Sequence, residues 1–215
     1  MRPAGFTFLV MALVGLLAGA ASAGLLLDDP RGLIGWKGTV RFEALPNLFV
    51  DVEYNVYAPG PDFETSFGAG KDPSNGTQFV YAYQILNNLP DHPPPGPYDY
   101  VTSFSVGLSD GDEQPASIGS VAVTGGTNPA LMYFSPAPPL VPSTATWKFI
   151  SSMKYPGFSN ILIYTSPYGP ELDNATVGGY SFDTHSVPSP TPEPATLALV
   201  AAGLGAARSF RRRRG

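Results

Sequence analysis

Two residues with the spacing of a catalytic pair are Ser151 and Lys154, which form an S-x-x-K motif. In serine acyl-enzymes this spacing places the two residues one helical turn apart, so that the amine can take the hydroxyl proton. Here the motif follows an apolar run and precedes Tyr155-Pro156-Gly157, and no S-D-N or K-T-G motif follows it. We therefore expect a turn between strands at these residues and no catalysis.

Three carboxylates lie close together around Gly111, at Asp110, Asp112 and Glu113. Hard cations such as Ca²⁺ prefer several oxygen ligands at close spacing, so these residues are the calcium candidates of the chain. An EF-hand loop also needs a bidentate glutamate at its last position, and that residue is missing here. The alternative is a solvated turn, which we favour, and we predict no bound metal or cofactor.

A second carboxylate pair, Asp51 and Glu53, lies on one face of a predicted strand. Glycosidases use paired carboxylates that lie about 5–9 Å apart across a cleft, and such pairs usually come from different strands. We therefore expect that Asp51 and Glu53 belong to a solvated sheet face and not to an active site.

The chain holds two histidines, His92 and His185, and no cysteine. The lack of cysteine excludes a disulfide scaffold, a thiolate nucleophile and Cys-ligated metal. Each histidine has an aspartate close by in the sequence, Asp91 or Asp183, but neither has a nucleophile nearby. We expect exposed loop positions for both histidines.

Residues 1–23 have the features of a secretory signal peptide. Arg2 precedes a 15-residue, largely apolar run at 6–20. Ala21-Ser22-Ala23 follows as a small-residue cleavage site. A signal peptidase would then cut after Ala23 and release a mature chain that starts at Gly24. The alternative is an N-terminal membrane anchor, for which the run is short, since a spanning helix needs about 20 residues.

A second pattern occupies the other end of the sequence. Pro192-Glu193-Pro194 precedes small or apolar residues at 195–207, and a basic cluster follows that comprises Arg208, Arg211, Arg212, Arg213 and Arg214. The apolar segment predicts a short transmembrane helix, and the arginines should remain cytoplasmic because they cross a bilayer poorly. The rest of the protein would then lie outside the cytoplasmic membrane. The alternative is a basic tail that binds nucleic acid or an acidic partner.

This pattern resembles the PEP-CTERM protein-sorting domain, which has the same three parts in the same order. The resemblance covers about 25 of the 215 residues, so it concerns the targeting of the protein and implies nothing about the body. It implies that the chain is a substrate of an exosortase, a membrane-embedded transpeptidase of Gram-negative bacteria that acts near the Pro-Glu-Pro motif. The processed protein would pass from the inner membrane to the cell envelope, the cell surface or the extracellular matrix.

The charge is distributed unevenly between these ends and the body. Residues 24–191 contain six basic and 16 acidic side chains, so this span carries a net charge of about −10. A body this acidic repels phosphate backbones, and we predict no nucleic-acid partner. Charged residues make up 13% of the chain, and 24 Gly and 24 Pro residues accompany 12% aromatics. This composition favours short strands joined by turns over a helical bundle.

The elements that would position these residues are strands. Apolar or alternating runs predict nine of them, at 38–44, 48–57, 78–87, 101–108, 117–124, 131–135, 145–150, 161–165 and 176–182. Such a series indicates an all-β fold, a two-sheet antiparallel sandwich that is either immunoglobulin-like or jelly-roll. We expect a signal peptide at 1–23, a β-sandwich ectodomain at 24–187, and a Pro-rich stalk with the sorting signal at 188–215.

Three functions fit this organisation. The first is an exported, non-enzymatic cell-surface or matrix protein that an exosortase processes. The second is a secreted carbohydrate-binding or adhesive module, because the 11 tyrosines could stack on sugar rings and an exopolysaccharide would be the partner. The third is a secreted hydrolase whose site is built from scattered loops. A pocket with convergent carboxylates or a Ser/His pair would favour the hydrolase, and a flat, Tyr-lined face would favour the adhesive module.

Overall fold

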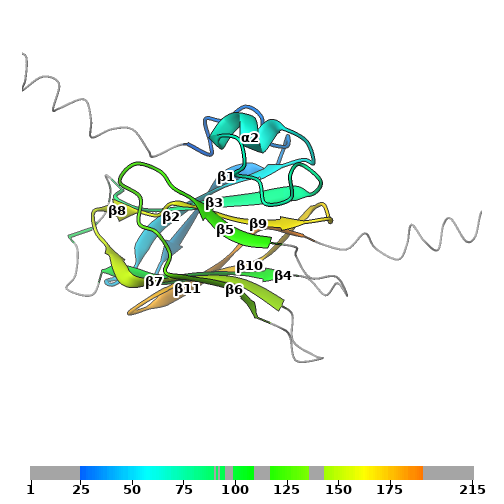
Figure 1. Cartoon of the computed structure of the whole chain (residues 1–215). Helices are drawn as coiled ribbons and strands as arrows, with labels where there is room; N and C mark the ends of the chain where they lie inside the picture. The colour runs from blue at the N-terminus through cyan, green and yellow to red at the C-terminus, as the bar shows by residue number, and fades with distance from the viewer. Residues whose placement is uncertain are drawn as a thin grey trace, which may run out of the picture.

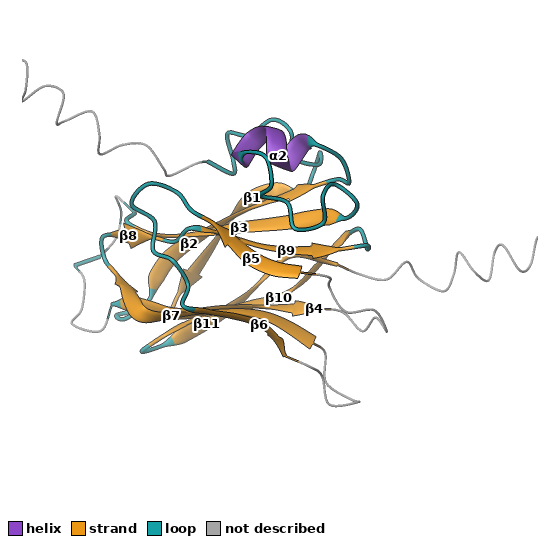
Figure 2. Cartoon of the chain, viewed as in Figure 1, coloured by secondary structure: helices purple, strands orange, loops and turns teal. Residues whose placement is uncertain are grey.

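The computed structural model describes residues 25–89, 91, 93–94, 99–108, 117–135 and 143–190. These residues form two antiparallel sheets that lie face to face, as Figure 1 shows. The one helix in the described part is α2 (Asp62–Phe67), which lies over the outer face of one sheet (Figure 2). The prediction of an all-β fold with two stacked antiparallel sheets is confirmed, and the choice between immunoglobulin-like and jelly-roll connectivity stays a prediction.

We call the two layers sheet A and sheet B. Sheet A has the order β1 (Lys37–Glu43), β2 (Phe49–Tyr57), β3 (Phe79–Asn87), β9 (Ile161–Ser166) and β5 (Ser117–Val121), with β8 (Gly157–Phe158) beside β3. Sheet B has the order β11 (Phe182–Pro190), β10 (Pro170–Gly179), β4 (Tyr100–Leu108), β7 (Ser143–Lys154) and β6 (Leu131–Ser135).

The main hydrophobic core lies between the two sheets. Tyr81, Tyr83 and Ile85 alternate along β3 and face this core, as the period of two in a strand predicts. Sheet B contributes Phe104 and Trp147, whose stacked ring centroids lie 5.8 Å apart. These large aromatic side chains fill the space that separates the sheets.

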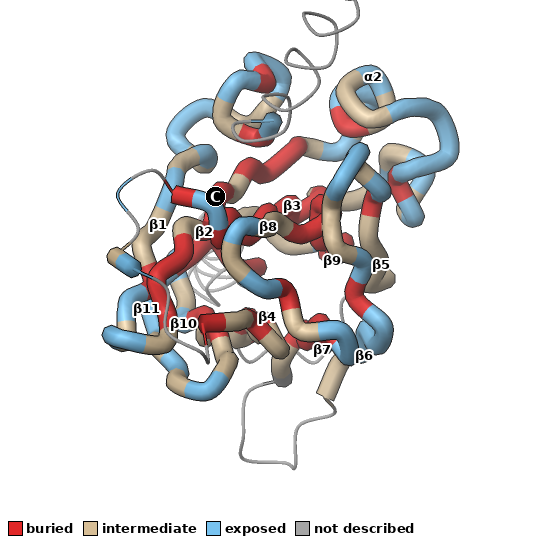
Figure 3. Tube along the Cα trace, turned by 90° about the vertical axis from the view of Figure 1, so that its left-hand side faces the viewer, coloured by how far each residue is buried: buried red, intermediate tan, exposed pale blue. Residues whose placement is uncertain are grey.

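A second buried layer covers the other face of sheet A. Residues 25–36, which we call the N-terminal strap, pack on this face together with α2 (Figure 1). Leu26 of the strap and Phe63 of α2 lie there in one cluster with Val80 and Ala82 of β3. Figure 3 shows the consequence, because buried residues run continuously along β3 when both of its faces are covered.

The expected solvated face at Asp51 and Glu53 is wrong. β2 alternates as predicted, but its polar side lies under the second layer, so Glu53 is 4% exposed and Asn55 is fully buried. Asp51, nearer the start of the strand, is half-buried and accepts a 3.2 Å hydrogen bond from Nη2 of Arg41. The sequence predicts the alternation of side chains along β2, but it does not show that other residues bury the polar face of this strand.

Eight of the nine predicted strands coincide with observed ones, and the last prediction is wrong. The run at 176–182 crosses the turn between β10 and β11, which reverses the chain at Tyr180 and Ser181. β11 then continues to Pro190, three residues past the expected end of the domain at Val187. Residues 188–190 therefore belong to the sandwich and not to a stalk.

No helix in the described ranges is long and apolar enough to cross a membrane. The expected transmembrane helix at 195–207 lies outside the described residues.

Candidate functional site

The end of β11 is the point at which the described chain leaves the sandwich. β11 is the edge strand of sheet B and pairs with β10 along its whole length, finishing with Pro190 opposite Pro170. An edge strand accommodates Pro188 and Pro190 because one side of its backbone has no partner strand to receive an N–H donor. Residues 187–190 are all buried. The last strand before the Pro-Glu-Pro segment is thus an integral part of the fold.

Two buried hydroxyl groups hold this end of β11. The Oγ of Ser189 donates a 2.5 Å hydrogen bond to the carbonyl oxygen of Gly107 in β4. From sheet A, the hydroxyl of Tyr83 donates to the carbonyl oxygen of Pro188, and it lies 3.1 Å from the hydroxyl of Tyr164. Burial raises the pKa of Tyr83 and of Tyr164 well above the usual value, so both phenols stay neutral. The exit of the chain is therefore tied to both sheets.

The sorting residues follow this anchored end directly. In the sequence, Thr191 alone separates Pro190 from Pro192-Glu193-Pro194. The motif and the basic cluster, Arg208, Arg211, Arg212, Arg213 and Arg214, lie outside the described residues. Ala21, Ala23 and Gly24, the expected signal cleavage site, lie outside them at the other end.

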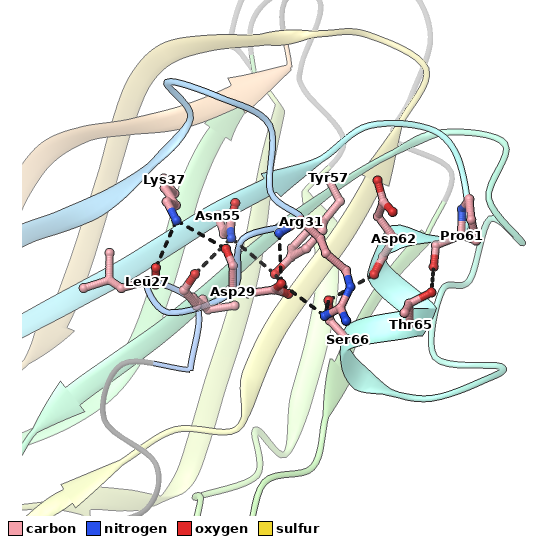
Figure 4. A network of polar contacts seen from close by, with 11 residues as sticks. Leu27, Asp29, Arg31, Lys37, Asn55, Tyr57, Pro61, Asp62, Thr65 and Ser66 are labelled. Carbon is pink, nitrogen blue, oxygen red and sulfur yellow. Dashed lines mark hydrogen bonds and ion pairs between the residues drawn. The ribbon is translucent and has the colours of Figure 1, made fainter.

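A network of polar contacts binds the N-terminal strap to sheet A and α2 (Figure 4). Nδ2 of Asn55 donates a 2.9 Å hydrogen bond to the carbonyl oxygen of Leu26, and the hydroxyl of Tyr57 donates at 2.9 Å to Oδ2 of Asp29. Nζ of Lys37 donates to the carbonyl oxygen of Leu27 at 3.1 Å. Each of these contacts joins the start of the described chain to a residue of β1 or β2.

Arg31 extends the same network to α2. Its Nη1 lies 3.4 Å from Oδ1 of Asp29 and donates at 3.3 Å to Oγ of Ser66. Burial would raise the pKa of Asp29, but hydrogen bonds from Ser66, the Arg31 amide and Tyr57 together lower it. Burial and the nearby Asp29 carboxylate raise the pKa of Tyr57. The arrangement thus pairs an ionised carboxylate with a neutral phenol, and its chemistry is that of a structural clasp.

Sequence reasoning missed this clasp. Asp29-Pro30 indicates a turn, but two partners of Asp29, Tyr57 and Ser66, lie far along the chain. Contacts between residues so far apart in the chain give no local sequence pattern that would predict them.

The structure places Ser151 and Lys154 in a strand. The expected turn is wrong, because both residues belong to β7, which continues to Lys154. The strand accommodates them through a register shift opposite Val101 and Ser103 of β4. Because β7 is a strand at both positions, Ser151 and Lys154 do not lie one helical turn apart, the arrangement that serine acyl-enzymes use.

His185 is exposed as expected, but the expected loop is wrong, because the residue lies in β11. Its Nε2 lies 3.0 Å from Oδ2 of Asp183, and its ring packs edge-on against Phe42 at 5.1 Å. Oδ2 of Asp183 also accepts a 2.7 Å hydrogen bond from the backbone N–H of Glu43, which joins β11 to β1. Burial would raise the pKa of Asp183, but these hydrogen bonds lower it. His92 lies outside the described residues.

The calcium candidates Asp110, Asp112 and Glu113 lie outside the described residues as well. Within the described ranges, no group of three or more His, Cys, Asp or Glu residues is arranged to hold a metal ion.

Comparison with protein families gives one match, to the PEP-CTERM protein-sorting motif at residues 190–214. Comparisons with curated proteins and with solved structures give no match. The match begins at Pro190, the last residue of β11, and covers the Pro-Glu-Pro segment, the apolar segment and the arginines. The chain therefore carries a PEP-CTERM protein-sorting motif that starts at the end of β11, the last strand of the described residues.

Proposed function

We propose that this protein is exported, held in the inner membrane by residues 195–207, and processed by an exosortase near Pro192-Glu193-Pro194. The product is a cell-surface or extracellular-matrix protein whose β-domain has no catalytic role. The observation that carries the proposal is the sorting motif at residues 190–214, placed directly after a buried strand.

The arrangement of the chain supports this order of events. Cleavage near Pro192 would leave β11 whole, because β11 ends at Pro190. The hydrogen bonds of Ser189 and Tyr83 would then keep the new end of the chain attached to the sandwich. Processing can therefore remove the membrane segment without exposing the core.

The contacts of the candidate catalytic residues support a non-enzymatic body. Ser151 and Lys154 lie on one extended strand without the helical geometry that acyl-enzyme chemistry needs. Asp183 and His185 bond to each other and to residues of β1, where they hold a sheet edge. Asp51 is engaged by Arg41. Asp51, Asp183 and His185 thus each already have a structural role.

Intact mass of the cell-surface protein tests the processing. In a strain with an active exosortase, the wild-type protein should begin at Gly24 and lack residues 195–215. Glu193→Ala should instead accumulate in the membrane with these residues present, and Glu171→Ala, which removes an exposed carboxylate outside the motif, should be processed normally. A wild-type surface protein that keeps residues 195–215 would contradict the proposal and leave a tail-anchored ectodomain.

Carbohydrate binding is a second candidate function for the body, and the outer face of sheet B favours it. One row of side chains crosses all five strands and carries a hydroxyl group at every position: Thr184, Thr176, Ser105, Thr146 and Tyr133. Oγ1 of Thr176 lies 2.9 Å from Oγ1 of Thr184, and Oγ of Ser105 lies 3.0 Å from Oγ1 of Thr146. Thr146 is only 6% exposed, so a ligand would meet chiefly the other hydroxyls of the row and the exposed ring of Tyr133 at its end, a surface that suits a neutral sugar polymer.

A glycan array tests this second function. The secreted β-domain should bind neutral glycans, and Tyr133→Ala should weaken that binding several-fold. Tyr180→Ala, which removes an exposed tyrosine at the β10–β11 turn, is the matched control and should bind as the wild type does. Absence of binding across the array would leave the exported, non-binding matrix protein as the function.

A further inference from the structure

The end of the sandwich from which the chain emerges has an apolar rim. We call it the exit end and define it as residues 166–172 with residues 187–190. Pro167 is exposed, and Leu172 is 58% exposed although it lies opposite Pro188 in the register of β10 and β11. Tyr168 lies between them, with its carbonyl oxygen bonded to the hydroxyl of Tyr81 at 2.8 Å. The rim is therefore built from proline, tyrosine and leucine on a firmly held turn.

The distance from this rim to the membrane segment is short. The apolar segment begins at Ala195, five residues after Pro190. Five residues reach at most about 18 Å even when fully extended. The headgroup layer on this side of the bilayer is about 6 Å thick, and the five residues must also cross it. The sandwich thus has no room to stand far above a bilayer that holds residues 195–207.

We propose that the exit end of the sandwich lies against the lipid headgroups of the inner membrane in the unprocessed protein, with Leu172 and Tyr168 at the lipid surface. This inference rests on the proposed function, because it needs the C-terminal segment in the bilayer. The occupant of the apolar rim is then the outer surface of that same membrane.

The chemistry of the rim fits a lipid interface. Tyrosine is enriched at the boundary between bilayer and water, where its ring meets the acyl chains and its polar end meets water. Glu171 is the one charged residue of the segment 166–172, and it is next to Leu172 in β10, so the two side chains point to opposite faces of the sheet. Leu172 can therefore touch lipid while the carboxylate points elsewhere.

The other end of the same hairpin provides a matched control. Phe182 is 74% exposed and lies opposite Gly178, six residues from Leu172 along β10. Six strand residues span about 20 Å, which is more than the headgroup layer of about 6 Å. Phe182 is thus an equally apolar, exposed residue that the proposal places in water.

Single cysteines report the orientation directly, because the chain has no cysteine of its own. Leu172→Cys and Phe182→Cys variants of the full chain, made in a Gram-negative host without an exosortase, are labelled with an environment-sensitive dye. The labelled proteins are reconstituted into vesicles of phosphatidylethanolamine and phosphatidylglycerol that contain a headgroup-linked quencher. The label at position 172 should be quenched several-fold more than the label at 182. Equal quenching at the two positions would overturn the proposal.

A longer connection between Pro190 and the apolar segment tests whether the short connection holds the exit end against the membrane. An insert of about 12 Gly and Ser residues between Pro190 and Thr191 adds an r.m.s. span of about 20 Å. Quenching at position 172 should then fall to the level at 182, and persistent strong quenching would refute the role of the short tether. Flotation of the vesicles tests the membrane intermediate separately from the orientation of the sandwich. Protein that fails to float contradicts the membrane intermediate itself, whereas protein that floats with a water-exposed label at 172 contradicts only the orientation.

Discussion

The hydroxyl of Tyr57 donates a 2.9 Å hydrogen bond to Oδ2 of Asp29, and this contact joins the last residue of β2 to the N-terminal strap. Both residues are buried, and the ring of Tyr57 also packs edge-on against Phe63 of α2 at 5.2 Å. One tyrosine of sheet A thus contacts both parts that cover its outer face, the N-terminal strap and α2. The stability of that layer should depend on its hydroxyl group.

Replacing Tyr57 with Phe tests this dependence. The change keeps the ring but removes the donor to Asp29, and a hydrogen bond to a charged group contributes about 1.5–3 kcal/mol. We expect the free energy of unfolding, measured by urea denaturation, to fall by an amount of that order. Tyr133→Phe is the control, because Tyr133 is partly exposed at the edge strand β6. A Tyr57→Phe variant as stable as the control would mean that the clasp contributes nothing.

The ionisation of Asp29 makes the clasp sensitive to acid. Its pKa is lowered from the usual 3.8, so the unfolded chain binds the proton more tightly than the folded one. The stabilisation is complete well above pH 3.8 and is lost as the pH falls through the lowered pKa. The stability difference between wild type and Asp29→Asn should therefore shrink on acidification below about pH 4.

Asp183 also has a lowered pKa, so the whole protein loses stability in the same range. The contributions of the two carboxylates can be separated by measuring urea midpoints between pH 3 and pH 7. The proteins compared are the wild type, Asp29→Asn and Asp183→Asn. Asp183→Asn should keep the part of the pH dependence that belongs to Asp29. If Asp29→Asn follows the wild type at every pH, then the carboxylate of Asp29 has no such role.

The strands were predictable where their residues alternate and where nearby turns bound them. β3 shows this clearly, because Tyr81, Tyr83 and Ile85 face the main core as their spacing predicts. β10 and β11 were not predictable as two strands, because Gly178 and Gly179 fall within the last predicted run, and prolines at 170, 188 and 190 look like strand breakers. Because β11 is an edge strand, its prolines do not leave a neighbouring strand without a hydrogen-bond donor. Whether a strand lies at an edge depends on the whole sheet and not on the local sequence.

The two covers of sheet A were not predictable for a different reason. α2 has six residues, too few to show a helical period. Asn55 looks like a solvent-facing residue of an alternating strand, and its burial depends on Leu26, whose carbonyl oxygen it binds. The sorting motif was predictable because its three parts are consecutive in the sequence and need no tertiary contact to be recognised.

Gly32 should be intolerant of any side chain. A Cβ atom at this position would lie 1.7 Å from Oδ1 of Asn55, which is fully buried and cannot move aside easily. Overpacking of this kind costs about 1–3 kcal/mol, so Gly32→Ala should lower the urea midpoint clearly. Gly119→Ala is the control, because its Cβ would meet Ile163 at an ordinary 3.6 Å. Equal effects of the two substitutions would show that the strap does not pack on Asn55 as described.

The last prediction concerns the anchor of β11. Ser189 is fully buried, and Ser189→Ala would leave the carbonyl oxygen of Gly107 without the 2.5 Å hydrogen bond that it accepts. A buried polar group without a partner costs about 1–3 kcal/mol. We expect a loss of stability of this order, and faster amide hydrogen exchange at positions 187 and 189 than in the rest of β11, because the strand end should detach first. Pro188 between them has no amide N–H.

Ser186→Ala is the matched control for Ser189→Ala, since Ser186 lies in the same strand but is exposed. It should change neither the stability nor the exchange rates. Detachment of the strand end would also lengthen the chain between the sandwich and Pro192, so the unprocessed Ser189→Ala protein should show weaker quenching of a label at position 172. Unchanged exchange at positions 187 and 189 would show that Tyr83, which donates to the carbonyl oxygen of Pro188, holds the end of β11 without help from Ser189.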